Sequence, residues 1–133
     1  MLYAYSEATV PKITVTIRKA YGGAYLGMCS KDLGADFVFC WPSTELAVMG
    51  AEGAAPIIFR RDLENAKDPD KLLEDKITEY REEFANPYRP AEHLHVDDII
   101  DPSETRIRLI EALEITKSKL EGRPTKKHGI IPA

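Results

Sequence analysis

Recognisable arrangements of side chains for acid–base or nucleophilic chemistry are nearly absent from this chain. The three histidines are His93, His95 and His128, and the first two form an H-x-H pair among acidic residues. That pair lacks further ligands at helical spacing, so a surface connector is favoured over a metal site, and no metal is expected. Ser30 and Ser43 have no nucleophile-elbow context, and neither a Walker A nor a GxGxxG motif is present.

A pair of glycines could contribute to chemistry through backbone N–H groups instead of side chains. The stretch RKAYGGAYLGM, residues 18–28, leaves a β-branched run and places Gly22 and Gly23 where a helix is expected to begin. Glycine lets the backbone approach another group closely, and the first N–H groups of a helix lack partners within it. Such amides can hold an oxygen anion. Glycine pairs also close ordinary turns, so the residues alone leave both interpretations open.

Composition narrows the class of protein. The 133 residues are 44% hydrophobic and 30% charged, with a formal net charge of −4, which suits a globular domain or a piece of a larger one. The net negative charge argues against binding to nucleic acid, and no apolar run is long enough to predict insertion into a membrane. Cys29 and Cys40 lack metal-ligand spacing. We expect two small buried thiols in a reducing compartment, and hence a cytoplasmic protein.

Hydrophobic periodicity predicts the elements that position the glycines. A helix is expected to end before Pro11, and a strand–turn–helix then a strand–strand–helix pattern follows. The expected strands are residues 12–19, 36–41 and 45–49, and the expected helices are residues 24–33 and 51–63, the latter bent or begun late because of Pro56. This rhythm predicts an α/β domain.

From Asp68 the composition changes to amphipathic helices. Leu73, Ile77, Tyr80 and Phe84 recur at helical spacing before the NP stop at residues 86–87. A proline-rich connector then leads to Ser103, the predicted cap of a helix over 104–122, and to a basic tail. We therefore divide the chain into a sheet-containing part, 1–67, and a helical part with its tail, 68–133.

Seven motifs, in order, cover almost the whole chain: KAYGGAY (19–25), SKxLGAD (30–36), WPxxExAVMG (41–50), GAxxIIFR (53–60), NPY (86–88), VDDIIDP (96–102) and KKHGIIP (126–132). Together they resemble the C-terminal carboxyltransferase domain in the beta chain of biotin-dependent acyl-CoA carboxylases. Within that family the resemblance is to propionyl-CoA carboxylase and the methylmalonyl-CoA decarboxylases. It implies a crotonase-like superhelix of ββα units, present here as a partial domain with C-terminal helices.

The resemblance also implies a chemistry that needs few acids and bases. In this family a carboxyl group moves between biotin, carried by a partner protein, and an acyl-CoA such as propionyl-CoA. Two oxyanions form in the reaction, and each is held by backbone N–H groups in an oxyanion hole. One of the two holes lies in an N-terminal domain that this chain does not contain. The other is implied at Gly23 and Ala24, which would face the ureido oxygen of biotin. Gly22 would permit the tight turn, and Gly23 the close approach.

Further site residues follow from the resemblance. Tyr25 is expected either in the pocket wall or in the core, while Met49, Gly50 and Gly53 are expected at a second strand-to-helix turn that could line the biotin channel. Leu26 occupies a position that influences the choice of acyl chain. Propionyl-type carboxylases usually carry Asp there, whereas some acetyl-tolerant and decarboxylase relatives carry an aliphatic residue. Leu26 therefore puts propionyl specificity in doubt.

The implied partners are a biotin carboxylase or biotin carrier subunit and other beta chains, in the cytoplasm or the mitochondrial matrix. Full beta chains are longer, so we expect this chain alone to be inactive. We also expect it to self-associate through apolar surface on the sheet and on the helix that carries Leu73, Ile77, Tyr80 and Phe84. Two alternatives stay open: the carboxyltransferase subunit of a methylmalonyl- or glutaconyl-CoA decarboxylase, and a non-catalytic assembly fragment.

Overall fold

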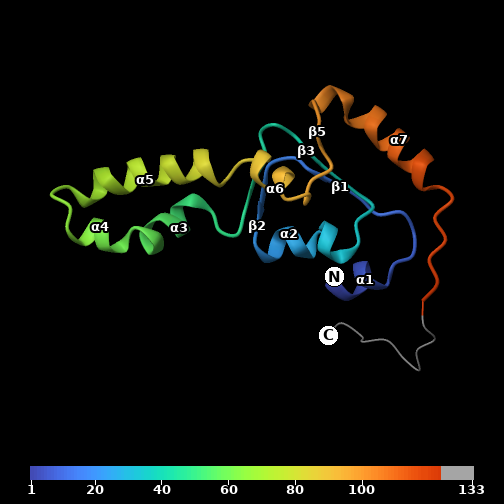
Figure 1. Ribbon diagram of the computed structural model, residues 1–133, viewed down its shortest axis with the longest axis horizontal. Coiled ribbons are helices and arrows are strands. Elements are labelled where there is room, and N and C mark those ends of the chain that lie inside the picture. Colours follow the sequence, from blue (N-terminus) through green and yellow to red (C-terminus); the bar gives the residue numbers. More distant parts are fainter. Residues whose placement is uncertain (124–133) are drawn as a thin grey trace.

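The computed structural model describes residues 1–123, which form a body of two small sheets with a long helical arm (Figure 1). The basic tail, including His128 and the KKHGIIP motif, lies outside the described residues. In the body, α1 spans Leu2–Glu7 and ends before Pro11, as predicted. The predicted boundary between 67 and 68 falls between two helices of the arm.

Both sheets are parallel. One has the order β1-β3-β5, from Ile13–Thr16, Phe37–Cys40 and Asp98–Ile99, and the other pairs β2, Lys19–Tyr21, with β4, Glu45–Ala47. The single strand predicted over 12–19 is therefore wrong. The chain passes from one sheet to the other after Thr16, whose carbonyl accepts the Trp41 N–H at 3.0 Å and the Thr44 hydroxyl at 2.7 Å.

The helix predicted over 24–33 is shorter than expected. Helix α2 spans Gly23–Gly27, and a separate 3-10 turn follows at Lys31–Leu33. Between them Cys29 has a φ of 70°, which a helix cannot continue through. The Thr14 hydroxyl donates to the Cys29 carbonyl at 2.8 Å and fixes this break against β1.

The arm, residues 51–83, consists of α3 (Ala51–Ile58), α4 (Arg60–Glu64) and α5 (Pro69–Glu83), and it extends away from the sheets as a hairpin (Figure 1). The predicted helix over 51–63 breaks at Phe59, one turn after Pro56. Tyr80 of α5 was expected on an exposed face. It is instead buried with Ala51 and Ala54, because α3 folds back over α5.

After the arm, α6 (Tyr88–Glu92) and β5 lead to a 3-10 turn at Pro102–Glu104 and to α7, Thr105–Thr116. Ser103 is not the cap that the sequence predicts. The Asp101 carboxylate accepts both the Ser103 N–H at 2.8 Å and its hydroxyl at 2.6 Å, so Asp101 begins the turn that precedes α7. None of the helices within 1–123 is long and apolar enough to cross a membrane.

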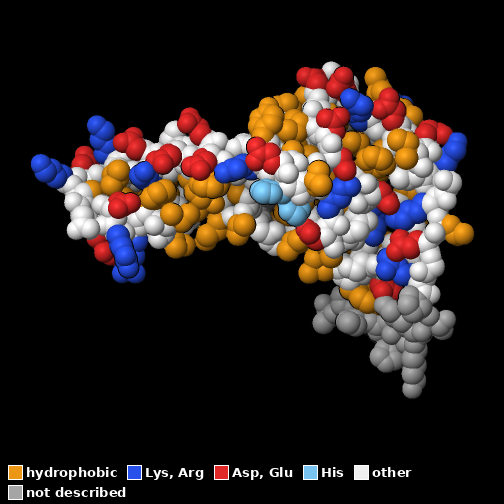
Figure 2. Space-filling model, viewed as in Figure 1, with side chains coloured by type: hydrophobic (Ala, Val, Ile, Leu, Met, Phe, Trp, Pro, Cys, Tyr) orange, Lys and Arg blue, Asp and Glu red, His pale blue; other side chains and the backbone are white. Residues whose placement is uncertain are grey.

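The core lies on both faces of the β1-β3-β5 sheet. Val38, Cys40 and Cys29 belong to the cluster that also receives Tyr25 of α2, while Phe39 and Ala112 belong to the cluster beneath α7. Both cysteines are free thiols and buried, as predicted. Exposed apolar side chains occur along much of the chain, and they include four on α7 and two on α3. Figure 2 shows hydrophobic side chains along the arm and at its junction with the body.

Asp36 fastens three segments of the body together. Its Oδ2 accepts the Lys12 N–H at 2.7 Å, at the start of β1, and lies 2.9 Å from the Lys119 ammonium, after α7. Lys119 also donates to the Val10 carbonyl at 3.3 Å. Burial alone would raise the pKa of the Asp36 carboxyl, but the Lys12 amide and the Lys119 ammonium together lower it.

We expect Asp36→Asn to reduce the free energy of unfolding by about 1–2 kcal/mol at neutral pH, measured by urea unfolding. Because the folded-state pKa is lowered, the stabilisation is complete above the ordinary aspartate pKa of about 4 and is lost as pH falls below it. The control is Glu114→Gln, which removes an exposed pair with Lys117 and should change little. A deficit for Asp36→Asn that persists undiminished at the lowest pH would contradict this account.

Candidate active site

Two glycine-containing turns leave the same edge of the smaller sheet. Because β2 and β4 are parallel, with Tyr21 opposite Ala47, both strands end at this edge. The chain then turns at Gly22 into α2 and at Gly50 into α3. The Gly22 N–H donates to the Ala47 carbonyl at 3.0 Å and joins the two turns. The carboxyl edge of a parallel sheet is where open α/β sheets bind their ligands.

Gly22 is the position that requires glycine. Its φ of 48° and ψ of −121° are rarely adopted by other residues, and a Cβ there would lie 2.8 Å from the Val48 carbonyl oxygen. A Cβ on Gly23 would meet nothing within 4 Å. The tight turn predicted for Gly22 is present, and the close backbone approach within the protein also falls on Gly22.

Gly23 and Ala24 present two adjacent backbone amides. Both residues are exposed at the start of α2, and neither N–H has a hydrogen-bond partner within residues 1–123. The first bonds of the helix are donated by later residues, Leu26 to the Gly22 carbonyl at 3.3 Å and Met28 to the Ala24 carbonyl at 3.1 Å. The two N–H groups are therefore free to receive an acceptor from outside this part of the chain.

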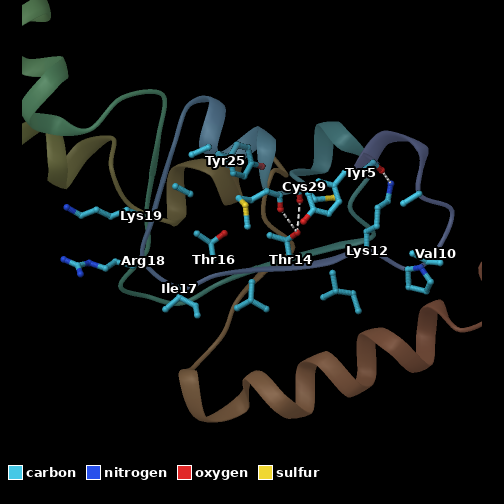
Figure 3. A pocket seen from close by; sticks show the side chains of 17 residues that line it. Tyr5, Val10, Lys12, Thr14, Thr16, Ile17, Arg18, Lys19, Tyr25 and Cys29 are labelled. Carbon is cyan, nitrogen blue, oxygen red and sulfur yellow. Dashed lines mark hydrogen bonds between the residues drawn. The ribbon is translucent and has the colours of Figure 1, made fainter. Parts of the chain in front are cut away.

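Ala24 lines an open cavity of about 660 Å³ between α1, β1 and α2. In Figure 3, Tyr25 and Cys29 form one wall and Thr14 and Thr16 face them from β1. Lysine and arginine side chains also line it, and no carboxylate of residues 1–123 does. An anionic ligand therefore meets no like charge on these walls.

Tyr25 and Leu26 take different places on α2. Tyr25 is half-buried, packs against the core, and donates from its hydroxyl to the His95 carbonyl at 3.3 Å; burial raises its pKa to about 12. The Tyr25 side chain therefore packs in the core and also forms part of the wall of the first cavity. Leu26 is 41% exposed and lines a second cavity of about 600 Å³, shared with Tyr80 and Phe84 at the foot of the arm.

The second turn lies beside the first. Its Val48 lines the second cavity, but Met49, Gly50 and Gly53 line neither cavity. Gly50 packs against the Tyr21 ring, since a Cβ there would lie 3.2 Å from Cε2. Met49 is 42% exposed, and Gly53 is exposed with the Met49 methyl 3.8 Å from its Cβ position. Gly50 thus lies against Tyr21, the residue before Gly22, and Gly53 lies beside Met49, while the contact of all three with a ligand stays a prediction.

Sequence reasoning missed a polar group beneath the two turns. The Tyr21 hydroxyl donates to the Glu45 carboxylate, and Arg81 of the arm lies between Glu45 and Glu52. Tyr21 and Glu45 fall within the KAYGGAY and WPxxExAVMG motifs, which was the available signal, whereas nothing in the sequence singled out Arg81. His93 and His95 line the second cavity together with Leu26, and no group of three or more potential metal ligands occurs within residues 1–123.

Comparison with known proteins identifies the family. The model of the carboxyl transferase domain matches residues 1–131. The chain belongs to this family. It is 59% identical over 132 residues to the methylmalonyl-CoA carboxyltransferase 12S subunit of Propionibacterium freudenreichii subsp. shermanii, and 56% identical over 132 residues to the methylmalonyl-CoA decarboxylase subunit alpha of Propionigenium modestum. Each match covers 99% of this chain but only 25% and 26% of these relatives.

Solved structures of this carboxyl transferase family show the same fold. A transcarboxylase 12S structure, described as a hexamer with methylmalonyl-CoA and methylmalonic acid bound, superposes with a TM-score of 0.92 at 58% identity, covering 99% of this chain and 25% of that one. The beta subunit of the Pseudomonas aeruginosa geranyl-CoA carboxylase gives a TM-score of 0.70 at 29% identity, covering 98% of this chain and 29% of that one. The predicted α/β, crotonase-like fold is confirmed.

Exchanging each glycine separately tests the geometry of the turn. We expect Gly22→Ala to destabilise the protein by about 1–3 kcal/mol, because the φ is strained for alanine and the Val48 carbonyl is too close. Gly23→Ala is the matched control and should be neutral or stabilising by up to about 1 kcal/mol, as glycine-to-alanine changes in helices are. Equal melting temperatures for the two variants would refute this geometry.

Proposed function

We propose that this chain forms part of a carboxyltransferase that moves a carboxyl group between biotin on a partner protein and an acyl-CoA. The observation that carries the proposal is the pair of amides at Gly23 and Ala24 that have no partner among residues 1–123, within the KAYGGAY motif of a chain that belongs to the carboxyl transferase family. The chain spans about a quarter of its relatives, so the complete active site is proposed to need the rest of the subunit.

The residues present fit the ureido group of biotin, which supplies the transferable carboxyl group when bound. Two adjacent N–H donors match the two lone pairs of one carbonyl oxygen. Gly23 and Ala24 would donate to that oxygen and stabilise the negative charge that develops on it, each by about 3 kcal/mol in the transition state. Gly22 would hold them in place, and Met49, Gly50 and Gly53 would line the approach.

A decarboxylase subunit is the second candidate. Two relatives at 56% and 59% identity are named methylmalonyl-CoA decarboxylase subunit alpha, and Leu26 is aliphatic, which the resemblance associates with such relatives. The same amides would serve both directions of transfer. We further propose that the subunit works with a biotin-bearing partner and with other copies of itself, in a reducing compartment that suits the free thiols of Cys29 and Cys40.

Removing one amide tests the proposed oxyanion role. In the full-length subunit with its biotin partner, replacing Ala24 by lactic acid exchanges the N–H for an ester oxygen and keeps the side chain. We expect kcat for carboxyl transfer to fall by about 10²–10³-fold, as on loss of one oxyanion donor. The same exchange at Ala66, whose N–H donates to the Leu63 carbonyl outside the site, is the control. An unchanged kcat for the Ala24 ester would refute the proposal.

A substitution that changes the charge and size of the side chain at position 26 tests the role of Leu26. Because this side chain is exposed in the second cavity beside the amides, we expect Leu26→Asp in the full-length enzyme to change the ratio of kcat/KM for acetyl-CoA and propionyl-CoA. The control is Leu113→Asp on the exposed face of α7. A ratio that stays the same in both variants would show that Leu26 does not select the acyl group.

A further inference from the structure

Tyr21 connects the two glycine turns by direct contact. It is the last residue of β2 and is followed by Gly22. Its ring packs against Gly50, the residue before α3, and its hydroxyl donates to the Glu45 carboxylate on β4. The Tyr21 side chain therefore touches the neighbouring strand and the second turn, and the Tyr21 backbone leads directly into the first turn.

Arg81 links this contact to the arm. Its Nη2 lies 2.5 Å from Glu52 Oε1, at the start of α3, and its Nε lies 3.9 Å from Glu45 Oε2. That Nε is buried and has no hydrogen-bond partner within residues 1–123. The guanidinium is thus held between two carboxylates, one on the sheet and one on the arm, although it projects from α5.

The contacts made by Tyr21 and Arg81 with the two carboxylates differ in strength. The Arg81–Glu52 pair is largely exposed, and such pairs contribute only about 0–1 kcal/mol. The Tyr21–Glu45 hydrogen bond is partly buried and goes to a charged acceptor, the stronger type. Burial, together with the bond to Glu45, raises the pKa of Tyr21 to about 12, so the hydroxyl is protonated and able to donate at neutral pH.

We propose that Tyr21, Glu45 and Arg81 form a positioning network that sets the direction of the Gly23 and Ala24 amides. None of the three lines either cavity, so they would act through Gly22, whose N–H is bonded to Ala47 in the strand that carries Glu45. The inference rests on the proposed function of the amides. Its physical basis is that misplacing a catalytic donor by about 1 Å costs up to 10²-fold in rate.

The experiment uses the full-length subunit with its biotin partner. Tyr21→Phe and Arg81→Met are each made with Ala24 intact and with Ala24 replaced by lactic acid, and kcat, KM for acyl-CoA and the melting temperature are measured. With Ala24 intact we expect about a 10-fold loss of kcat for Tyr21→Phe, a smaller loss for Arg81→Met, and KM within twofold of the parent. In the lactic acid background the further loss should be clearly smaller, about 2–3-fold, because only the Gly23 N–H remains to be positioned.

The control is Arg108→Met, which breaks pairs with Asp98 and Glu111 beside α7 and should leave kcat unchanged. Equal losses in both Ala24 backgrounds, or kcat within twofold of the parent for Tyr21→Phe, would overturn the network while leaving the oxyanion role intact. An Ala24 ester with unchanged kcat would overturn both proposals. If Arg81→Met fails to fold, the Tyr21→Phe pair decides the question alone.

Discussion

The close approach of Gly22 to the β4–α3 turn is the constraint on which the rest of this site depends. The Val48 carbonyl leaves no room for a Cβ, and the Gly22 N–H is already bonded to Ala47. With its φ of 48° the chain turns sharply out of β2, so the next two N–H groups leave the sheet without partners among residues 1–123. A turn that only glycine adopts readily thus precedes two N–H donors that are free among residues 1–123.

This arrangement explains how a chain whose sequence shows no recognisable constellation of catalytic acid and base side chains can belong to an enzyme family. A preorganised N–H donor requires no proton transfer and costs no reorganisation when charge develops, so it suits a reaction whose proposed difficulty is the stabilisation of oxygen anions. The remaining structure has the task of holding these donors still. In the proposed positioning network, the parallel pairing of β2 with β4, the Tyr21 hydroxyl and the helical arm would all contribute to that rigidity.

Much of the fold could be predicted because local pattern and final structure agree. The glycine turn, the buried β3 strand and the amphipathic helix α5 all follow the expected periodicity. The failures have non-local causes. Residues 12–19 read as one strand, but the Trp41 and Thr44 contacts to Thr16 divide them between two sheets. The Tyr80 face looked exposed because sequence periodicity does not show that α3 folds back over it. Arg81 could not be found because its partners lie 29 and 36 residues away.

The most direct measurement is a structure of the full-length subunit with biotin bound in the site. The account predicts that the ureido oxygen lies 2.7–3.1 Å from the backbone nitrogens of both Gly23 and Ala24, with Gly22 still in its left-handed conformation. It is contradicted if the ureido oxygen is held by other groups, or if these two amides are bonded to the rest of the protein.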